Sequence, residues 1–84
     1  MLREIKIDQL SKLKKGDVFM TKGDTQLVSP MYYKFIQISG ESVEVYSLDS
    51  DLKINSAKFW IAISAFNTRI KYGELFILRG NENE

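Results

Sequence analysis

The chain contains no cysteine and no histidine among its 84 residues. Without cysteine it has no disulfide framework, no thiolate nucleophile and no thiolate-ligated metal site. Without histidine it lacks the side chain most used for acid–base catalysis near neutral pH and for binding transition metals. These absences exclude the catalytic triads that use either residue, and the absence of cysteine suits a reducing compartment.

Glycine and proline are also sparse: the chain has five glycines, none of them adjacent to another, and one proline. Phosphate-binding loops need closely spaced glycines, so the sequence offers no such loop. The longest uncharged run, residues 59–68, is too short to cross a membrane as a helix. We therefore expect a soluble cytoplasmic protein that is not an enzyme, binds no cofactor or metal and contacts no membrane.

Hydrophobic residues make up 44% of the chain, including one Trp, four Tyr and five Phe. This is enough apolar surface for one folded core, and the length leaves no room for a second. We expect a single small β-barrel domain over residues 1–79 and a mobile C-terminal tail over residues 80–84. A chain this short needs most of its large side chains in the core. We therefore expect the core to contain Phe19, Phe35, Val45 and Phe76.

The formal net charge of +1 is unevenly distributed along the sequence. Residues 40–52 contain acidic side chains and no basic ones, whereas the segments on both sides are basic. Asp49 and Asp51 provide too few oxygen ligands for a cation site, and we interpret them as a turn. A nearly neutral chain is a poor match to a dedicated nucleic-acid binder, although its basic flanks leave a one-sided basic face open.

Two Gly-Asp pairs predict turns around a short strand over residues 17–22. In Gly16–Asp17 and Gly23–Asp24 the glycine takes positive φ without a steric clash, and the aspartate bonds to nearby amides. The phrase LKKGDVF, which leads into this strand, resembles the same region of SH3-like barrels. The resemblance and the short strand spacing imply a mainly β fold, a small antiparallel curled sheet or barrel.

The segment MYYKFIQIS, residues 31–39, has two apolar sets of opposite phase. Side chains alternate strictly along a flat strand, so Tyr33 and Phe35 would face one side and Ile36 and Ile38 the other. We expect both pairs to face the core, which a flat strand does not allow. A β-bulge between the two sets resolves the conflict, because one extra residue exchanges the phase. Tyr32 is then the residue of this segment left outside to meet a partner.

Further turn and cap signals predict the remaining elements. In the strand over residues 43–48, Val43 and Val45 face inward while Glu44 and Tyr46 face outward. A two-turn helix follows over residues 65–72. The other predictions are an extended segment at 3–7, a helical turn at 8–13 capped by Asp8, a loop at 23–30, a hairpin turn at 39–42, a strand start at 52–54, strands at 57–63 and 74–79, and helix caps at Ser64 and Gly73.

The function best supported by this pattern is a non-enzymatic binding module of the protein–protein interaction, adaptor or inhibitor type. Aromatic side chains with a polar end are favoured interface anchors. We expect a protein partner or a homodimer, and the segment 31–39 to be the strand edge most able to pair. The predicted partner-binding residues are Tyr32, Tyr46, Trp60, Lys34, Lys58, Arg69 and Lys71.

The alternative is a small barrel that binds nucleic acid by stacking bases on exposed aromatics beside basic side chains. Against this alternative stands the assignment of Trp60 and at least one tyrosine to the core, which we weigh at about two to one; against the protein partner stands an exposed tyrosine with no task. Basic residues gathered on one face around an exposed Trp60 or Tyr32 favour nucleic acid. A scattered distribution with an apolar patch near Tyr46 and Tyr32 favours a protein partner.

Overall fold

The computed structural model describes residues 2–22 and 30–80. The predicted turn at Gly23–Asp24, the loop at 23–29 and the tail at 81–84 lie outside these residues. Gly80, predicted to begin the tail, is instead the last residue of a strand and lies opposite Leu2.

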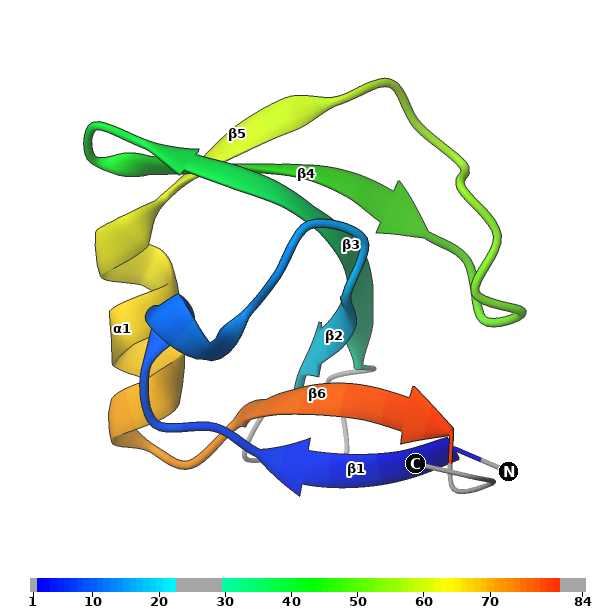
Figure 1. The fold of residues 1–84 in the computed structure, drawn as a ribbon, viewed down its shortest axis with the longest axis horizontal. Helices are drawn as coiled ribbons and strands as arrows, with labels where there is room; N and C mark the ends of the chain where they lie inside the picture. The colour runs from blue at the N-terminus through cyan, green and yellow to red at the C-terminus, as the bar shows by residue number, and fades with distance from the viewer. Residues whose placement is uncertain (1, 23–29, 81–84) are drawn as a thin grey trace.

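The described chain forms one six-stranded antiparallel sheet with a helix before the last strand (Figure 1). The predicted mainly β fold with a curled antiparallel sheet is therefore confirmed. The elements are β1 (Leu2–Lys6), the 3-10 turn η1 (Leu10–Lys12), β2 (Val18–Thr21), β3 (Met31–Ser39), β4 (Ser42–Leu48), β5 (Phe59–Ala62), α1 (Ile63–Lys71) and β6 (Leu75–Gly80).

The strand order is β1-β6-β2-β3-β4-β5, and the sheet is not closed. It bends so far that β4 and β5 lie at the opposite side of the molecule from β6 and β1, and α1 spans the side between β5 and β6 (Figure 1). Strands β1 and β5 are the two edges. The segment predicted to be a free edge, β3, lies inside the sheet between β2 and β4, so that prediction is wrong.

The predicted bulge in β3 is present. Pairing with β4 shifts register between Phe35 and Gln37, so Ile36 is the extra residue. Phe35 is buried as expected and Tyr33 packs against the core. Ile38, however, is 41% exposed. It lies beyond the part of β3 that β2 covers, which ends at Lys34, so no strand flanks it on that side.

Two predicted turns have the expected geometry. Gly16 has φ 91°, and a carboxylate oxygen of Asp17 accepts a hydrogen bond from the Lys14 N–H at 2.8 Å. In the hairpin between β3 and β4, Gly40 has φ 59° at the first of the two central positions. A two-residue hairpin of type II′ requires a glycine there.

The inner face of the curled sheet is the face that packs against α1, and it contains the core. Phe19 and Val45 are fully buried, and the Phe66 ring from α1 meets the Phe19 ring at 5.4 Å and the Tyr33 ring at 5.9 Å between centroids. Phe76, predicted to be core, is only partly buried. Since its neighbours Leu75 and Ile77 face inward, it points to the other side, where the Lys22 ammonium lies 4.9 Å from its ring centroid.

Helix α1 begins one residue before its predicted Ser64 cap. Its N-cap is Ala62, which has no side chain to bond the first amides. Instead, the Ile63 N–H donates to the Glu41 carbonyl in the β3–β4 turn at 2.8 Å. A backbone carbonyl from the neighbouring turn thus satisfies the first of the amides that have no partner within the helix.

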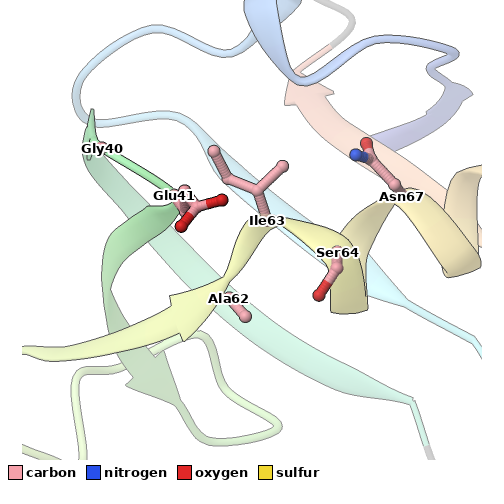
Figure 2. A pocket seen from close by; sticks show the side chains of 6 residues that line it. All are labelled: Gly40, Glu41, Ala62, Ile63, Ser64 and Asn67. Carbon is pink, nitrogen blue, oxygen red and sulfur yellow. The ribbon is translucent and has the colours of Figure 1, made fainter.

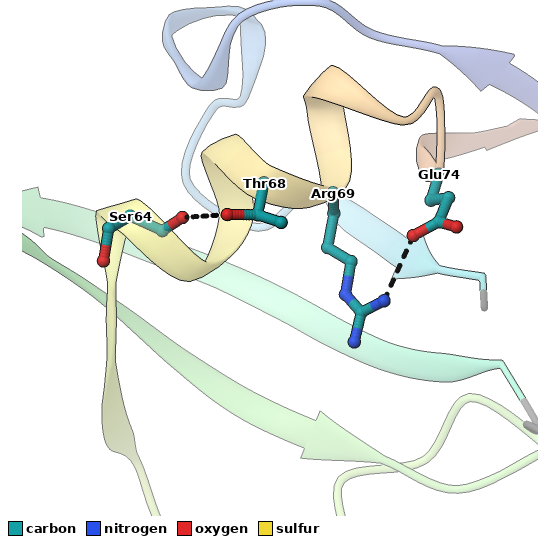
Figure 3. Close-up of polar contacts among 4 residues, drawn as sticks. All are labelled: Ser64, Thr68, Arg69 and Glu74. Carbon is teal, nitrogen blue, oxygen red and sulfur yellow. Dashed lines mark hydrogen bonds and ion pairs between the residues drawn. The ribbon is translucent and has the colours of Figure 1, made fainter. Parts of the chain in front are cut away.

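The other end of α1 matches the prediction. Gly73 has φ 71° and its N–H donates to the Ile70 carbonyl, which is a left-handed helix ending. The Thr68 hydroxyl donates to the Ser64 carbonyl at 3.0 Å, and an Arg69 nitrogen lies 3.1 Å from a Glu74 oxygen (Figure 3).

Two local predictions differ from the structure. Asp8 does not cap η1, whose N-cap is Gln9. The Asp8 carboxylate instead pairs with the Lys12 ammonium at 2.9 Å, and the hydrogen bond and positive charge of Lys12 lower the pKa of Asp8. Residues 52–54 form no strand: Ile54 makes an isolated bridge to Leu48.

Candidate functional site

The outer face of the sheet, opposite α1, brings together most of the predicted binding residues. Side chains alternate between the faces, so residues next to inward-facing ones point outward. Tyr33 and Val45 face inward, which places their neighbours on the outer face. Five of the seven predicted residues belong to this side of the sheet, Lys58 through its contact with Glu44: Tyr32, Lys34, Tyr46, Lys58 and Trp60.

The residues around Trp60 form a continuous surface across three strands. Trp60 lies opposite Glu44 in the register of β5 and β4, and Glu44 lies opposite Gln37 of β3. One row further along, Tyr46 lies opposite Lys34. We call this surface the Trp60 patch; it consists of Trp60, Glu44, Gln37, Tyr46, Lys34 and Lys58.

Trp60 is 49% exposed and lies on the edge strand of the patch. The assignment of this ring to the core is therefore wrong, because the alternation that turns Phe59 and Ile61 toward the core turns Trp60 away from it. A tyrosine does join the core, but it is Tyr33, whose burial raises its pKa while the charge of Arg69 opposes that rise.

Glu44 faces outward as predicted but is only 8% exposed. The Gln37 amide donates to one of its carboxylate oxygens at 3.0 Å, and the Lys58 ammonium lies 3.9 Å from the other. The carboxylate is thus fixed between its two strand neighbours. The sequence marks Glu44 only as a polar residue between two valines, and pairing across strands explains why it is covered.

Tyr32 lies outside the Trp60 patch and is less exposed than predicted. It is opposite Met20 of β2 and Leu48 of β4, and both of these are buried. A hollow of about 180 Å³ opens beside it, lined by Glu4, Met20, Tyr32, Ser50, Leu52 and Leu78. Tyr32 therefore belongs to a second apolar cluster on the outer face, and Trp60 is the exposed ring.

The turn beside that hollow is shaped by Asp49. One of its carboxylate oxygens accepts the backbone N–H groups of Asp51 and Lys53 at 2.9 and 3.0 Å. Leu52 consequently adopts φ 64°, an uncommon value for a side chain of this size. This supports the interpretation of Asp49 and Asp51 as a turn.

Arg69 and Lys71 lie on α1, across the sheet from the Trp60 patch. The Arg69 guanidinium pairs with Glu74, and Lys12 of η1 pairs with Asp8. The basic side chains considered for nucleic acid are therefore scattered over η1, α1 and the approach to β5. In the described parts of the chain they do not form one basic face around Trp60.

A larger hollow, of about 420 Å³, lies where the β3–β4 turn meets the start of α1 (Figure 2). Its lining includes the Glu41 side chain and Ala62. No ion pair or side-chain hydrogen bond of the Glu41 carboxylate occurs within residues 2–22 and 30–80. In the same residues no three acidic side chains gather closely enough to hold a metal ion.

No family model, curated protein or solved structure matches this chain. Among the described residues, no helix has the length and apolar character needed to cross a membrane.

Proposed function

We propose that this protein is a non-enzymatic protein-binding module that uses the Trp60 patch to hold its partner. The observation that carries the proposal is the placement of the only tryptophan. A fold of this size needs its large side chains to hold its core, yet this ring is 49% exposed. Tryptophan and tyrosine are the residue types most enriched at the energetic centres of protein interfaces.

The surroundings of Trp60 also support a protein partner. Lys34 and Tyr46 lie side by side, and they offer an ammonium and a ring with a polar end. Glu44 is held in place by Gln37 and Lys58, so this part of the patch is already ordered before it binds. A surface that is ordered in advance loses less side-chain entropy on association.

Nucleic acid fits this surface less well. Glu44 places a carboxylate directly opposite Trp60, and its negative charge disfavours a polyanionic strand stacked on that ring. Lys58 is engaged with that carboxylate, and Arg69 with Glu74. The cytoplasmic location and the SH3-like character of the fold remain predictions; the first is supported by the absence of cysteine.

The proposal is tested by affinity capture from extracts of the native cell. The variants Trp60→Ser and Tyr46→Ser remove rings from the patch, and Tyr72→Ser is the control because it removes a ring that is 67% exposed at the end of α1. After nuclease treatment, we expect wild type and Tyr72→Ser to capture the same partner proteins. Both patch variants should fail to capture them.

Two results contradict the proposal. The first is equal capture by all four proteins. The second is tight binding of a random oligonucleotide that weakens steeply with added salt, because that salt dependence reports contacts to phosphate groups.

A further inference from the structure

The two edges of the sheet differ in how they are protected against pairing. An edge strand exposes backbone N–H and C=O groups, and natural edges are commonly blunted by charged side chains, proline or bulges. Strand β1 has the sequence LREIK, with three charged residues among its five. Strand β5 has the sequence FWIA, with no charged residue and no proline.

The backbone groups that point away from the sheet along β5 can be assigned from the pairing. Residues of an antiparallel pair alternate between those bonded to the partner strand and those bonded away from it. The Ile63 N–H donates to Glu41, so Phe59 and Ile61 also bond toward β4. The N–H groups of Trp60 and Ala62 therefore point outward, and no backbone group in the described chain meets them.

We propose that the edge of β5 pairs with β5 of a second copy of this chain, antiparallel and centred on Trp60. The inference goes beyond the proposed function, because it concerns the backbone edge and leaves Tyr46 and Lys34 of the outer face open to another partner. Centring on Trp60 places the outward N–H and C=O groups of Trp60 opposite the same groups of Trp60 in the second copy. It also uses the whole strand, because residues 58–62 of each copy then face residues 62–58 of the other.

This register makes the side chains of the strand complementary to themselves. On the inner face, Phe59 lies opposite Ile61 of the second copy twice, an aromatic–β-branched pair of the kind that stabilises sheets. On the outer face, the two Trp60 rings meet. Lys58 lies opposite Ala62 and not opposite a second Lys58, so no like charges face each other.

Charge complementarity favours a second copy of this chain over an unrelated strand. Ala62 and Glu41 line the same hollow, where Figure 2 shows the Glu41 carboxylate. In this register each Lys58 lies opposite Ala62, next to this hollow in the other copy, and its ammonium, which is 55% exposed and only loosely paired with Glu44 at 3.9 Å, can turn toward Glu41. The carboxylate of Glu41 thereby gains a cation, and the symmetry of the pair forms this contact twice.

Ala62→Pro tests the pairing with little expected disturbance of the monomer. Ala62 has φ −60° and ψ 137°, and proline fixes φ near this value. The substitution removes an N–H that points outward, and a residue just before the first helical turn needs none for the helix. Ala62→Ser is the matched control, because serine keeps the N–H and is a good N-cap.

Sedimentation velocity over a range of protein concentrations measures the dimer, with circular dichroism as the check on folding. We expect wild type and Ala62→Ser to form a dimer, and the dissociation constant of Ala62→Pro to rise by about tenfold or more, because two of the hydrogen bonds across the pair are lost. If Ala62→Pro does not fold, Glu41→Lys decides the matter: it should weaken the dimer more than Asp51→Lys, which makes the same charge change in another turn.

A wild-type chain that stays monomeric up to millimolar concentration overturns the inference, as does a dimer that neither Ala62→Pro nor Glu41→Lys weakens. A monomer whose β5 edge instead takes up an extended peptide also overturns it. Failure of this inference can be distinguished from failure of the proposed function. Tyr46→Ser tests the outer face without altering the β5 edge, whereas Ala62→Pro alters the edge and leaves Tyr46 and Lys34 in place.

Discussion

Strands β1 and β5 end the same sheet, but they present different edges. Strand β1 pairs with β6 along all five of its residues and its pairing continues at Ile7, whose N–H donates to Leu75. Its outward-facing backbone belongs to Leu2, Glu4 and Lys6, and Glu4 forms an ion pair with Lys22. Strand β5 is shorter, uncharged and followed at once by α1. The difference indicates that the protein blocks pairing at one edge and permits it at the other.

The largest expected effect concerns the core on which both edges depend. Phe19→Ala should lower the free energy of unfolding by about 3–5 kcal/mol, because the ring is fully buried and contacts Tyr33 and Phe66. Trp60→Ala should cost less than about 1 kcal/mol in the monomer. Chemical denaturation at low protein concentration measures both, and equal losses would show that Trp60 is a core residue and not part of an open edge.

The second prediction gives β5 the protection of β1. Trp60→Lys places a charge on the open edge, as Lys6 does on the other, and should raise the dimer dissociation constant by about tenfold or more. The matched control is Tyr72→Lys, which adds the same charge at the end of α1. Sedimentation velocity would contradict the comparison if the two variants dimerised equally well.

The third prediction removes the protection of β1. Glu4→Thr combined with Lys6→Thr leaves Arg3 as the one charged residue of β1 and should increase association severalfold, while loss of the exposed pair with Lys22 should cost less than about 1 kcal/mol. Light scattering at rising concentration measures the gain. Unchanged association would mean that charge is not what separates the two edges.

The smallest effect belongs to Tyr33, which lies in β3 between the two edges. Burial raises the pKa of Tyr33 above its ordinary 10.0. The unfolded chain therefore loses the tyrosine proton at a lower pH than the folded chain, so the stability due to the neutral ring is present below pH 10 and falls as pH rises through the folded pKa. Tyr33→Phe should lose less stability than wild type above pH 10 and match its pH dependence below about pH 9. Parallel curves above pH 10 would contradict this.

Local chemistry was sufficient to predict much of the fold. The bulge in β3 follows from two apolar sets of opposite phase, and the turn at Gly16 and the helix ending at Gly73 follow from glycine's freedom to adopt positive φ. The outward direction of Trp60 was also contained in the alternation of β5. It was left open, because the size of the ring favoured the core while its place beside Lys58 favoured a binding surface.

The remaining features depend on contacts between distant segments. The start of α1 is fixed by a carbonyl 22 positions earlier, since Ile63 donates to Glu41. The cover over Glu44 comes from the neighbouring strands, and the identity of the edges depends on strand order. None of these leaves a local signature, so the sequence placed the pairing edge in β3 and Tyr32 at the binding surface.

Amide hydrogen exchange, followed residue by residue by NMR at low and high protein concentration, tests the difference between the edges most directly. The N–H groups of Trp60 and Ala62 should become protected as concentration rises, while those of Glu4 and Lys6 continue to exchange rapidly. Unchanged exchange at Trp60 and Ala62, or new protection at Glu4 and Lys6, would contradict the account.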